Sequence, residues 1–165
     1  MMKVKIVKYI FLLLYILSFG YHCYSSLQSG EASSGLSKSI TEVVVEIEEK
    51  VFHIEVTDFD KVHTSVRKII GHFAYFGLIS IFGFLCIYFY TLKLSKTLII
   101  SSIIGATMAA TSEILQIFAD ARGPSIKDAF IDYGGYTLAT LIMFFIIFLI
   151  LKRKTKNSQI SDTGK

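Results

Sequence analysis

Charged residues are scarce in this chain of 165 residues. Asp, Glu, Lys and Arg together make up 18% of the sequence, whereas hydrophobic residues make up 53%. Soluble domains contain about 25% charged and about 45–50% apolar residues. The composition therefore excludes an ordinary soluble domain and indicates a membrane protein.

Tryptophan is missing, and cysteine and proline are rare. The two cysteines, Cys23 and Cys86, share no motif spacing. One falls near the end of an apolar run and the other in the middle of a second run, so we expect no disulfide between them. We interpret both as apolar packing residues rather than redox or metal-binding groups. The single proline, Pro124, follows Gly123 and predicts a turn, because proline cannot continue a helix.

Long apolar runs are abundant in the sequence. A transmembrane helix needs about 20 consecutive, mostly apolar residues. Runs at 69–91, 98–119 and 129–151 meet this length, and a shorter run lies at 4–24. We predict an all-α integral membrane protein, with one domain over 1–165 that forms a bundle of four transmembrane helices.

The first apolar run also has the features of a secretory signal peptide, because Lys3, Lys5 and Lys8 accompany its start. No Ala-x-Ala cleavage sequence follows the run. We therefore favour a retained anchor, and a cleaved signal peptide is the alternative.

The basic residues are unevenly distributed along the chain. Residues 21–66 hold three basic and eight acidic residues, whereas the tail at 152–165 holds Lys152, Arg153, Lys154, Lys156 and Lys165. Basic residues of membrane proteins gather on the cytoplasmic side. We predict a multi-pass protein of the cell membrane with both termini cytoplasmic and an extracytoplasmic loop at 25–66. We interpret the tail as a stop-transfer anchor rather than a nucleic-acid-binding segment.

The predicted outer loop has three parts. Residues 25–37 are rich in Ser and Gly and predict an exposed loop. A short amphipathic helix should follow, lying on the membrane surface or on the bundle, and a strand over 51–56 is the alternative. The apolar residues of this helix recur at helical spacing, at Ile40, Val43, Val44, Ile47, Val51 and Ile54. Thr57 with Asp60 three residues later predicts a helix start that leads into the second span.

Polar residues from three predicted helices fall at one membrane depth. They are Lys68, His72 and Tyr75 on one face of the second span, Glu113 and Gln116 at the end of the third, and Asp128, Asp132 and Gly135 at the start of the fourth. At 1.5 Å rise per residue, all lie within roughly 10 Å of the outer boundary. Charged groups in membranes usually face the bundle interior and pair with one another.

We expect Arg122 or Lys68 to pair with Glu113, Asp128 or Asp132. A structural interpretation stays open for each residue taken alone. Asp128 suits the N-terminal end of a helix, Glu113 with Gln116 suits an interhelical clasp, and His72 suits a hydrogen bond to a neighbouring helix. The shared face and depth favour a binding or catalytic site for the whole set.

Three segments, "VRKIIGHFAYFGL", "SEILQIF" and "RGPSIKDAFIDYGG", resemble the VanZ-like family of small bacterial membrane proteins. That family has a basic residue four before a His, then Glu-x-x-Gln, then an Arg-containing loop and Asp-x-x-x-Asn-x-x-Gly. The resemblance extends over about 8–152 and assigns to this pattern Lys68, His72, Glu113, Gln116, Arg122, Asp128 and Gly135. Asp132 departs from it, since the family usually has Asn there.

The resemblance implies a role in the bacterial cell envelope, because the name-giving member is associated with resistance to teicoplanin. We expect an outer-leaflet polar site that binds a membrane lipid, a lipid-linked cell-wall precursor or a glycopeptide, without a cofactor. The expected ligand-binding residues are Lys68, His72, Tyr75, Glu113, Gln116, Arg122, Asp128 and Asp132.

Other functions remain open. In an intramembrane enzyme, His72 would act as general base and Glu113 or Asp128 as general acid. The sequence contains no Gly-x-Ser-x-Gly, His-Glu-x-x-His or Gly-rich phosphate loop. A metal site made by His72, Glu113 and Asp128 has little support and is not expected, because only one His is available. A transporter subunit and a structural assembly factor are the remaining alternatives.

Overall fold

The computed structural model describes residues 2–53 and 55–163. The described residues are 87% helical and contain no strand. The helices, in chain order, are α1 (Met2–Ser26), α2 (Gly30–Val51), α3 (Phe59–Val66), η1 (Arg67–Ala74), α4 (Tyr75–Thr91), α5 (Leu94–Gln116) and α6 (Ile126–Thr163). The predicted all-α fold class is confirmed, and the alternative strand over 51–56 is not formed in the described part of that segment.

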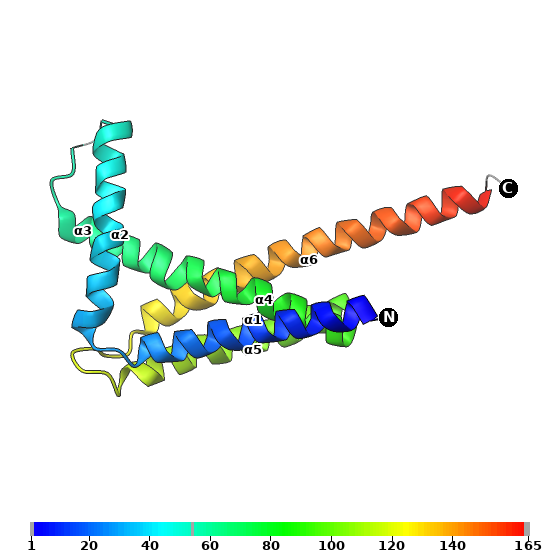
Figure 1. The fold of residues 1–165 in the computed structure, drawn as a ribbon, viewed down its shortest axis with the longest axis horizontal. Helices are drawn as coiled ribbons and strands as arrows, with labels where there is room; N and C mark the ends of the chain where they lie inside the picture. The colour runs from blue at the N-terminus through cyan, green and yellow to red at the C-terminus, as the bar shows by residue number, and fades with distance from the viewer. Residues whose placement is uncertain (1, 54, 164–165) are drawn as a thin grey trace.

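Four helical segments are long and apolar enough to cross a membrane. They are Ile6–Ser26, Phe59–Thr91, Leu94–Gln116 and Ile126–Asn157. Figure 1 shows α1, α4, α5 and α6 running alongside one another, with both termini at one end of the bundle and α2 across the opposite end. The four predicted spans are confirmed, with the second and fourth longer than expected. The basic tail continues α6 as a helix over its described part, as far as Thr163.

The Ser- and Gly-rich segment at 25–37 is mostly helical, so the prediction of an exposed loop there was wrong. Helix α2 begins at Gly30, because Ser29 caps it by accepting a hydrogen bond from the backbone N–H of Ala32 at 3.3 Å. The Gly30 N–H donates to the carbonyl of Asp120 at 2.9 Å. This bond docks the start of α2 on the turn between α5 and α6. A cap and a tertiary contact thus outweigh the weak helix propensity of Ser and Gly.

Helix α2 is amphipathic, as predicted. Part of its apolar face remains uncovered, with exposed fractions of 55% for Val43, 46% for Ile47 and 64% for Val51. The other face carries acidic residues, among them Glu46, which accepts a hydrogen bond from Lys50 in an exposed ion pair. An apolar face of this kind suits the membrane surface.

The second span is one continuous helix that changes its winding. It begins at Phe59, capped by Asp58, which accepts from the N–H of Lys61 at 3.0 Å. The cap therefore lies one residue after the Thr57 that the sequence predicts. From Arg67 to Ala74 the helix is a π-helix, η1, and α4 then continues it. π-Helical turns are rare and frequently lie at functional sites.

The core lies between α4, α5 and α6. Phe76, Ile79, Met108, Ala109 and Tyr136 form its buried cluster. Near this cluster, Ser80 and Thr140 share a hydrogen bond of 2.7 Å between their hydroxyl groups, which closes a polar contact inside the bundle. Helix α1 packs at the periphery, and most of its apolar residues remain exposed, as expected for a helix that faces lipid.

Candidate functional site

The polar residues of three helices meet at the end of the bundle that α2 covers. His72 on η1 and Asp132 on α6 form the closest pair, with Nδ1 of His72 2.9 Å from Oδ1 of Asp132. Asp132 is fully buried and His72 is 9% exposed. A buried carboxylate that binds one ring nitrogen orients the imidazole and selects its tautomer. Nε2 of His72 has no hydrogen-bond partner among the described residues.

Glu113 holds the end of α5 to the start of α6. Its Oε1 accepts from the Gln116 amide at 2.8 Å, and its Oε2 accepts from the backbone N–H of Ser125 at 2.6 Å. The Ser125 hydroxyl in turn accepts from the N–H of Asp128 at 3.2 Å and caps α6. The turn at Pro124 is therefore organised by Glu113.

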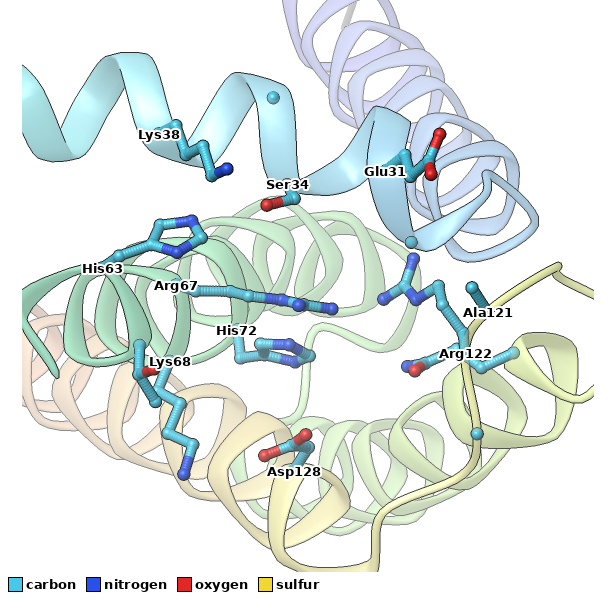
Figure 2. Close-up of a pocket in the computed structure, with 15 residues that line it drawn as sticks. Glu31, Ser34, Lys38, His63, Arg67, Lys68, His72, Ala121, Arg122 and Asp128 are labelled. Atoms are coloured by element: carbon cyan, nitrogen blue, oxygen red, sulfur yellow. The ribbon is translucent and has the colours of Figure 1, made fainter. Parts of the chain in front are cut away.

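A cavity of about 690 Å³ opens above these residues. It lies between α2, the α3–η1 segment and the α5–α6 turn (Figure 2). Four cationic side chains and two carboxylates contribute to its lining, so the formal charge is +2 when the histidines are neutral. The titratable lining residues are Lys38, Arg67, Lys68 and Arg122, with Glu31 and Asp128, and with His63 and His72. The cavity is suited to an anion.

Arg122 extends into the cavity from the α5–α6 turn. Its Nη1 donates to the carbonyl of Ser25 at 3.1 Å, and its buried Nε has no partner among the described residues. Burial lowers the pKa of Arg122, and the neighbouring Arg67 cation lowers it further, whereas Glu113 and Asp128 raise it. Figure 2 shows Arg67 and Arg122 reaching toward one another from opposite walls.

The expected ion pairs of Arg122 and Lys68 are not formed among the described residues. The pairs within 4.0 Å there are Lys50–Glu46 and His72–Asp132. Glu113 is already bonded to Gln116 and Ser125, which leaves Arg122 to bind a backbone carbonyl instead. The prediction that the charges neutralise one another directly was therefore wrong.

The structure brings most of the predicted site residues to this end of the bundle. Lys68, His72, Gln116, Arg122 and Asp128 line the cavity, and Glu113 and Asp132 lie beside it. Tyr75 is displaced toward α1, where its hydroxyl donates to the carbonyl of Ser18 at 3.0 Å. It lines a smaller neighbouring cavity of about 280 Å³, which shares lining residues with the larger one.

Sequence reasoning missed Arg67. It lies five residues before His72, and in an α-helix that spacing places two side chains on different faces. The i to i+5 hydrogen bonding of a π-helix brings these positions close to one face, and both residues line the cavity. The adjacent basic residues at 67 and 68 could have indicated that Arg67 belongs to the site. The spacing of an ordinary α-helix, however, places only Lys68 on the same face as His72. Lys38 and His63 were missed because their helices pack over the cavity only in the folded chain.

The fold and the site define an all-helical, multi-span membrane protein with a basic polar cavity at one end of its bundle. The family model VanZ/LLP1 matches residues 7–150. The chain therefore belongs to the VanZ/LLP1 family, as the resemblance predicted. No curated protein and no solved structure matches the chain.

Proposed function

We propose that this protein is a cell-envelope component that binds the anionic headgroup of a membrane lipid or lipid-linked cell-wall precursor in the outer leaflet. The proposal depends on one observation: Arg67 and Arg122 converge on one cavity, and neither forms an ion pair with a carboxylate among the described residues. Guanidinium groups bind phosphate in a bidentate manner and remain charged at any physiological pH.

The smaller cavity supports an amphiphilic ligand. It shares Arg67, His72 and Arg122 with the larger cavity, and apolar and aromatic side chains also line it, among them Ile40 and Ile70. A ligand with a phosphate-bearing head and an apolar chain would place its head between the two arginines. The first part of its chain would then lie in the smaller cavity.

The charge distribution supports an outward-facing cavity. The basic tail lies at the end of the bundle opposite the cavity, on the same side as the N-terminus (Figure 1). Because basic residues gather on the cytoplasmic side, this distribution supports the proposal that both termini are cytoplasmic and that the cavity faces outward.

Arg67→Ala is expected to weaken binding of a polyprenyl-diphosphate-linked wall precursor by roughly 10- to 100-fold. A hydrogen-bonded charged group contributes about 1.5–3 kcal/mol, and every 1.4 kcal/mol corresponds to about a factor of ten in affinity. The measurement is a titration of the fluorescently labelled precursor into the full-length protein in phosphatidylcholine nanodiscs. Arg122→Ala should act in the same direction.

Lys127→Ala is the matched control for this titration. It removes one positive charge from an exposed position beside the α5–α6 turn but outside the cavity lining. Equal affinity of wild type, Arg67→Ala and Lys127→Ala would contradict the proposal. A parallel titration with phosphatidylglycerol separates binding of a wall precursor from binding of any anionic lipid.

Expression of the wild type in a teicoplanin-sensitive bacterium is expected to raise the inhibitory concentration of teicoplanin, as the family resemblance implies. Arg122→Ala and Glu113→Gln should reduce the increase, because one removes a cavity cation and the other the anchor of the turn. Susceptibility is measured with membrane levels matched by immunoblot. Wild type indistinguishable from empty vector would exclude this resistance role and leave envelope lipids as the ligand class.

The His72–Asp132 pair favours an acid/base enzyme as the second candidate function. A buried carboxylate that orients an imidazole beside a ligand cavity is an arrangement suited to general-base chemistry. Recovery of the bound precursor separates the two functions, since a binding protein returns it unchanged and an enzyme returns a product. Loss of product formation in the conservative variants Glu113→Asp and Asp128→Glu would also favour the enzyme.

A further inference from the structure

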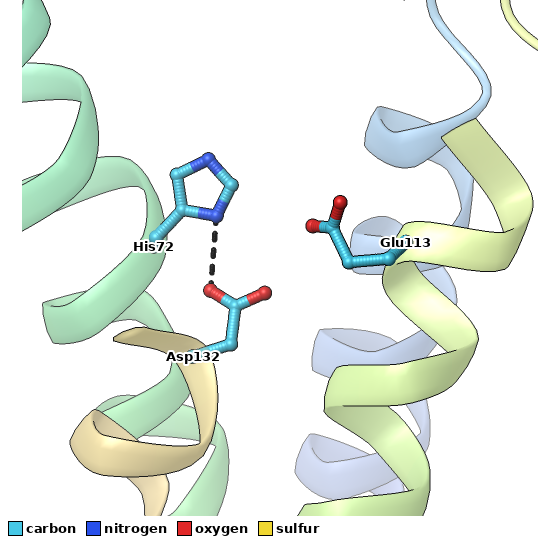
Figure 3. A group of neighbouring side chains, drawn as sticks. All are labelled: His72, Glu113 and Asp132. Atoms are coloured by element: carbon cyan, nitrogen blue, oxygen red, sulfur yellow. Dashed lines mark hydrogen bonds and ion pairs between the residues drawn. The ribbon is translucent and has the colours of Figure 1, made fainter. Parts of the chain in front are cut away.

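Three side chains with metal-binding atoms face one another beside the large cavity. They come from three different elements, His72 from η1, Glu113 from α5 and Asp132 from α6 (Figure 3). One ring nitrogen of His72 and one oxygen of each carboxylate all lie within 4.8 Å of one another. The sequence grouped His72 and Glu113 with Asp128, whereas the fold places Asp132 in the third position.

The spacing of these atoms is close to that of ligands around one ion. Two ligand atoms at about 2.1 Å from a metal lie roughly 3.0–3.4 Å apart at tetrahedral or right-angled geometry. Nδ1 of His72 and Oδ1 of Asp132 are already 2.9 Å apart. The ligand oxygen of Glu113 lies within 4.8 Å of both other ligand atoms, so all three can approach one ion. The bonds from Gln116 and Ser125 fix Glu113 and still leave each of its oxygens a free lone pair.

A second observation at Asp132 points to a ligand. Its Oδ2 is buried and has no hydrogen-bond partner among the described residues, although the residue is 0% exposed. Buried polar atoms normally have a partner. In Figure 3 the second carboxylate oxygen of Asp132 lies on the side of Glu113, which faces it across the gap. Two buried carboxylates repel one another, and a dication between them offsets both charges.

We propose that His72, Glu113 and Asp132 form a binding site for a divalent transition-metal ion, with its open coordination positions toward the cavity. A mixed set of one imidazole and two carboxylates suits Zn²⁺ or Mn²⁺, whereas Ca²⁺ and Mg²⁺ prefer oxygen ligands alone. The site goes beyond the proposed function, because the ion binds whether or not an anionic lipid occupies the cavity.

Metal binding to the purified full-length protein in detergent tests the site directly. After removal of metal with EDTA, the wild type should take up one Zn²⁺ or Mn²⁺ ion per chain by elemental analysis and melt at a higher temperature. Ca²⁺ and Mg²⁺ at the same concentration should change neither quantity. Asp132→Asn and His72→Gln should weaken binding at least about tenfold.

Asp120→Asn is the matched control, since it removes an exposed carboxylate of the nearby turn and should bind the ion like the wild type. A pulsed electron-spin experiment on the Mn²⁺-loaded wild type adds a measurement that no variant can confound, and it should detect one imidazole nitrogen. Failure to bind either ion in stoichiometric amount, or Mn²⁺ binding without a nitrogen ligand, would overturn the proposal. Because no lipid is added, either result is independent of the headgroup titration.

Discussion

Gly135→Ala is expected to destabilise the protein more than an added methyl group ordinarily does. A Cβ at this position would overlap the carbonyl group of Phe73, with the carbonyl carbon at 2.7 Å and Cα at 2.9 Å. Real Cβ atoms essentially never approach another heavy atom within 3.0 Å, and here the obstacle is backbone that cannot rotate away. Helix α6, which carries Gly135, and η1, which carries Phe73, must therefore move apart.

The separation would reach the candidate site. Phe73 is next to His72 on η1, and Gly135 lies three residues after Asp132 on α6, one helical turn away. The close approach at Gly135 is thus what allows His72 and Asp132 to come within 2.9 Å. Overpacking of this kind costs about 1–3 kcal/mol or more, and we expect a fall in melting temperature of roughly 5–10 °C.

Thermal unfolding of the detergent-solubilised variant measures this effect, with Gly134→Ala as the matched control. A Cβ at position 134 would meet Cε2 of Phe73 at 3.7 Å, which is ordinary van der Waals contact. Gly134→Ala should therefore melt within a few degrees of the wild type. Similar melting temperatures for the two variants would show that α6 does not approach η1 as closely as described.

Glu113→Gln is expected to lower stability by about 1–3 kcal/mol even though it preserves the size of the side chain. The Glu113 carboxylate accepts one hydrogen bond at each oxygen, from Gln116 and from the Ser125 N–H. An amide has only one oxygen, so with that oxygen on the Ser125 N–H its NH₂ group would face the NH₂ group of Gln116. The Gln116 amide would have to turn over to restore the hydrogen bond, and otherwise a buried donor is left without an acceptor, which is destabilising.

The effect of Glu113→Gln should extend beyond stability, because the turn at Pro124 carries Arg122 and leads directly into α6. We expect Glu113→Gln to weaken precursor binding together with thermal stability, whereas Arg67→Ala should weaken binding alone. Glu31→Gln is the control, since Glu31 is an exposed acid on the cavity wall that makes no side-chain hydrogen bond among the described residues. A Glu113→Gln protein as stable as Glu31→Gln would show that Glu113 does not organise the turn.

Much of the fold was predictable from local sequence. An apolar run long enough to cross a membrane becomes a helix wherever lipid surrounds it. A helix is the conformation in which a single segment forms all of its backbone hydrogen bonds internally. This requirement determined the four spans. The turn followed from the proline, which cannot continue a helix, and the helix that leads into the second span followed from a capping pattern. The exposed loop predicted at 25–37 was wrong because the conformation there is not decided locally. The start of α2 depends on a hydrogen bond from the Gly30 N–H to the carbonyl of Asp120, which is far away in the sequence.

By itself, the sequence determined the membrane class, the four spans and the set of polar residues that gather at one end. Helical periodicity and span length are local properties, and they place His72, Glu113 and Asp128 at one depth. Only the tertiary structure decided which of these groups touch. The π-helical winding of η1 brings Arg67 into the cavity, and the close approach of α6 at Gly135 pairs His72 with Asp132. Both depend on packing between helices, where shifts of an ångström change the partner of a side chain and leave the hydrophobic pattern unaltered.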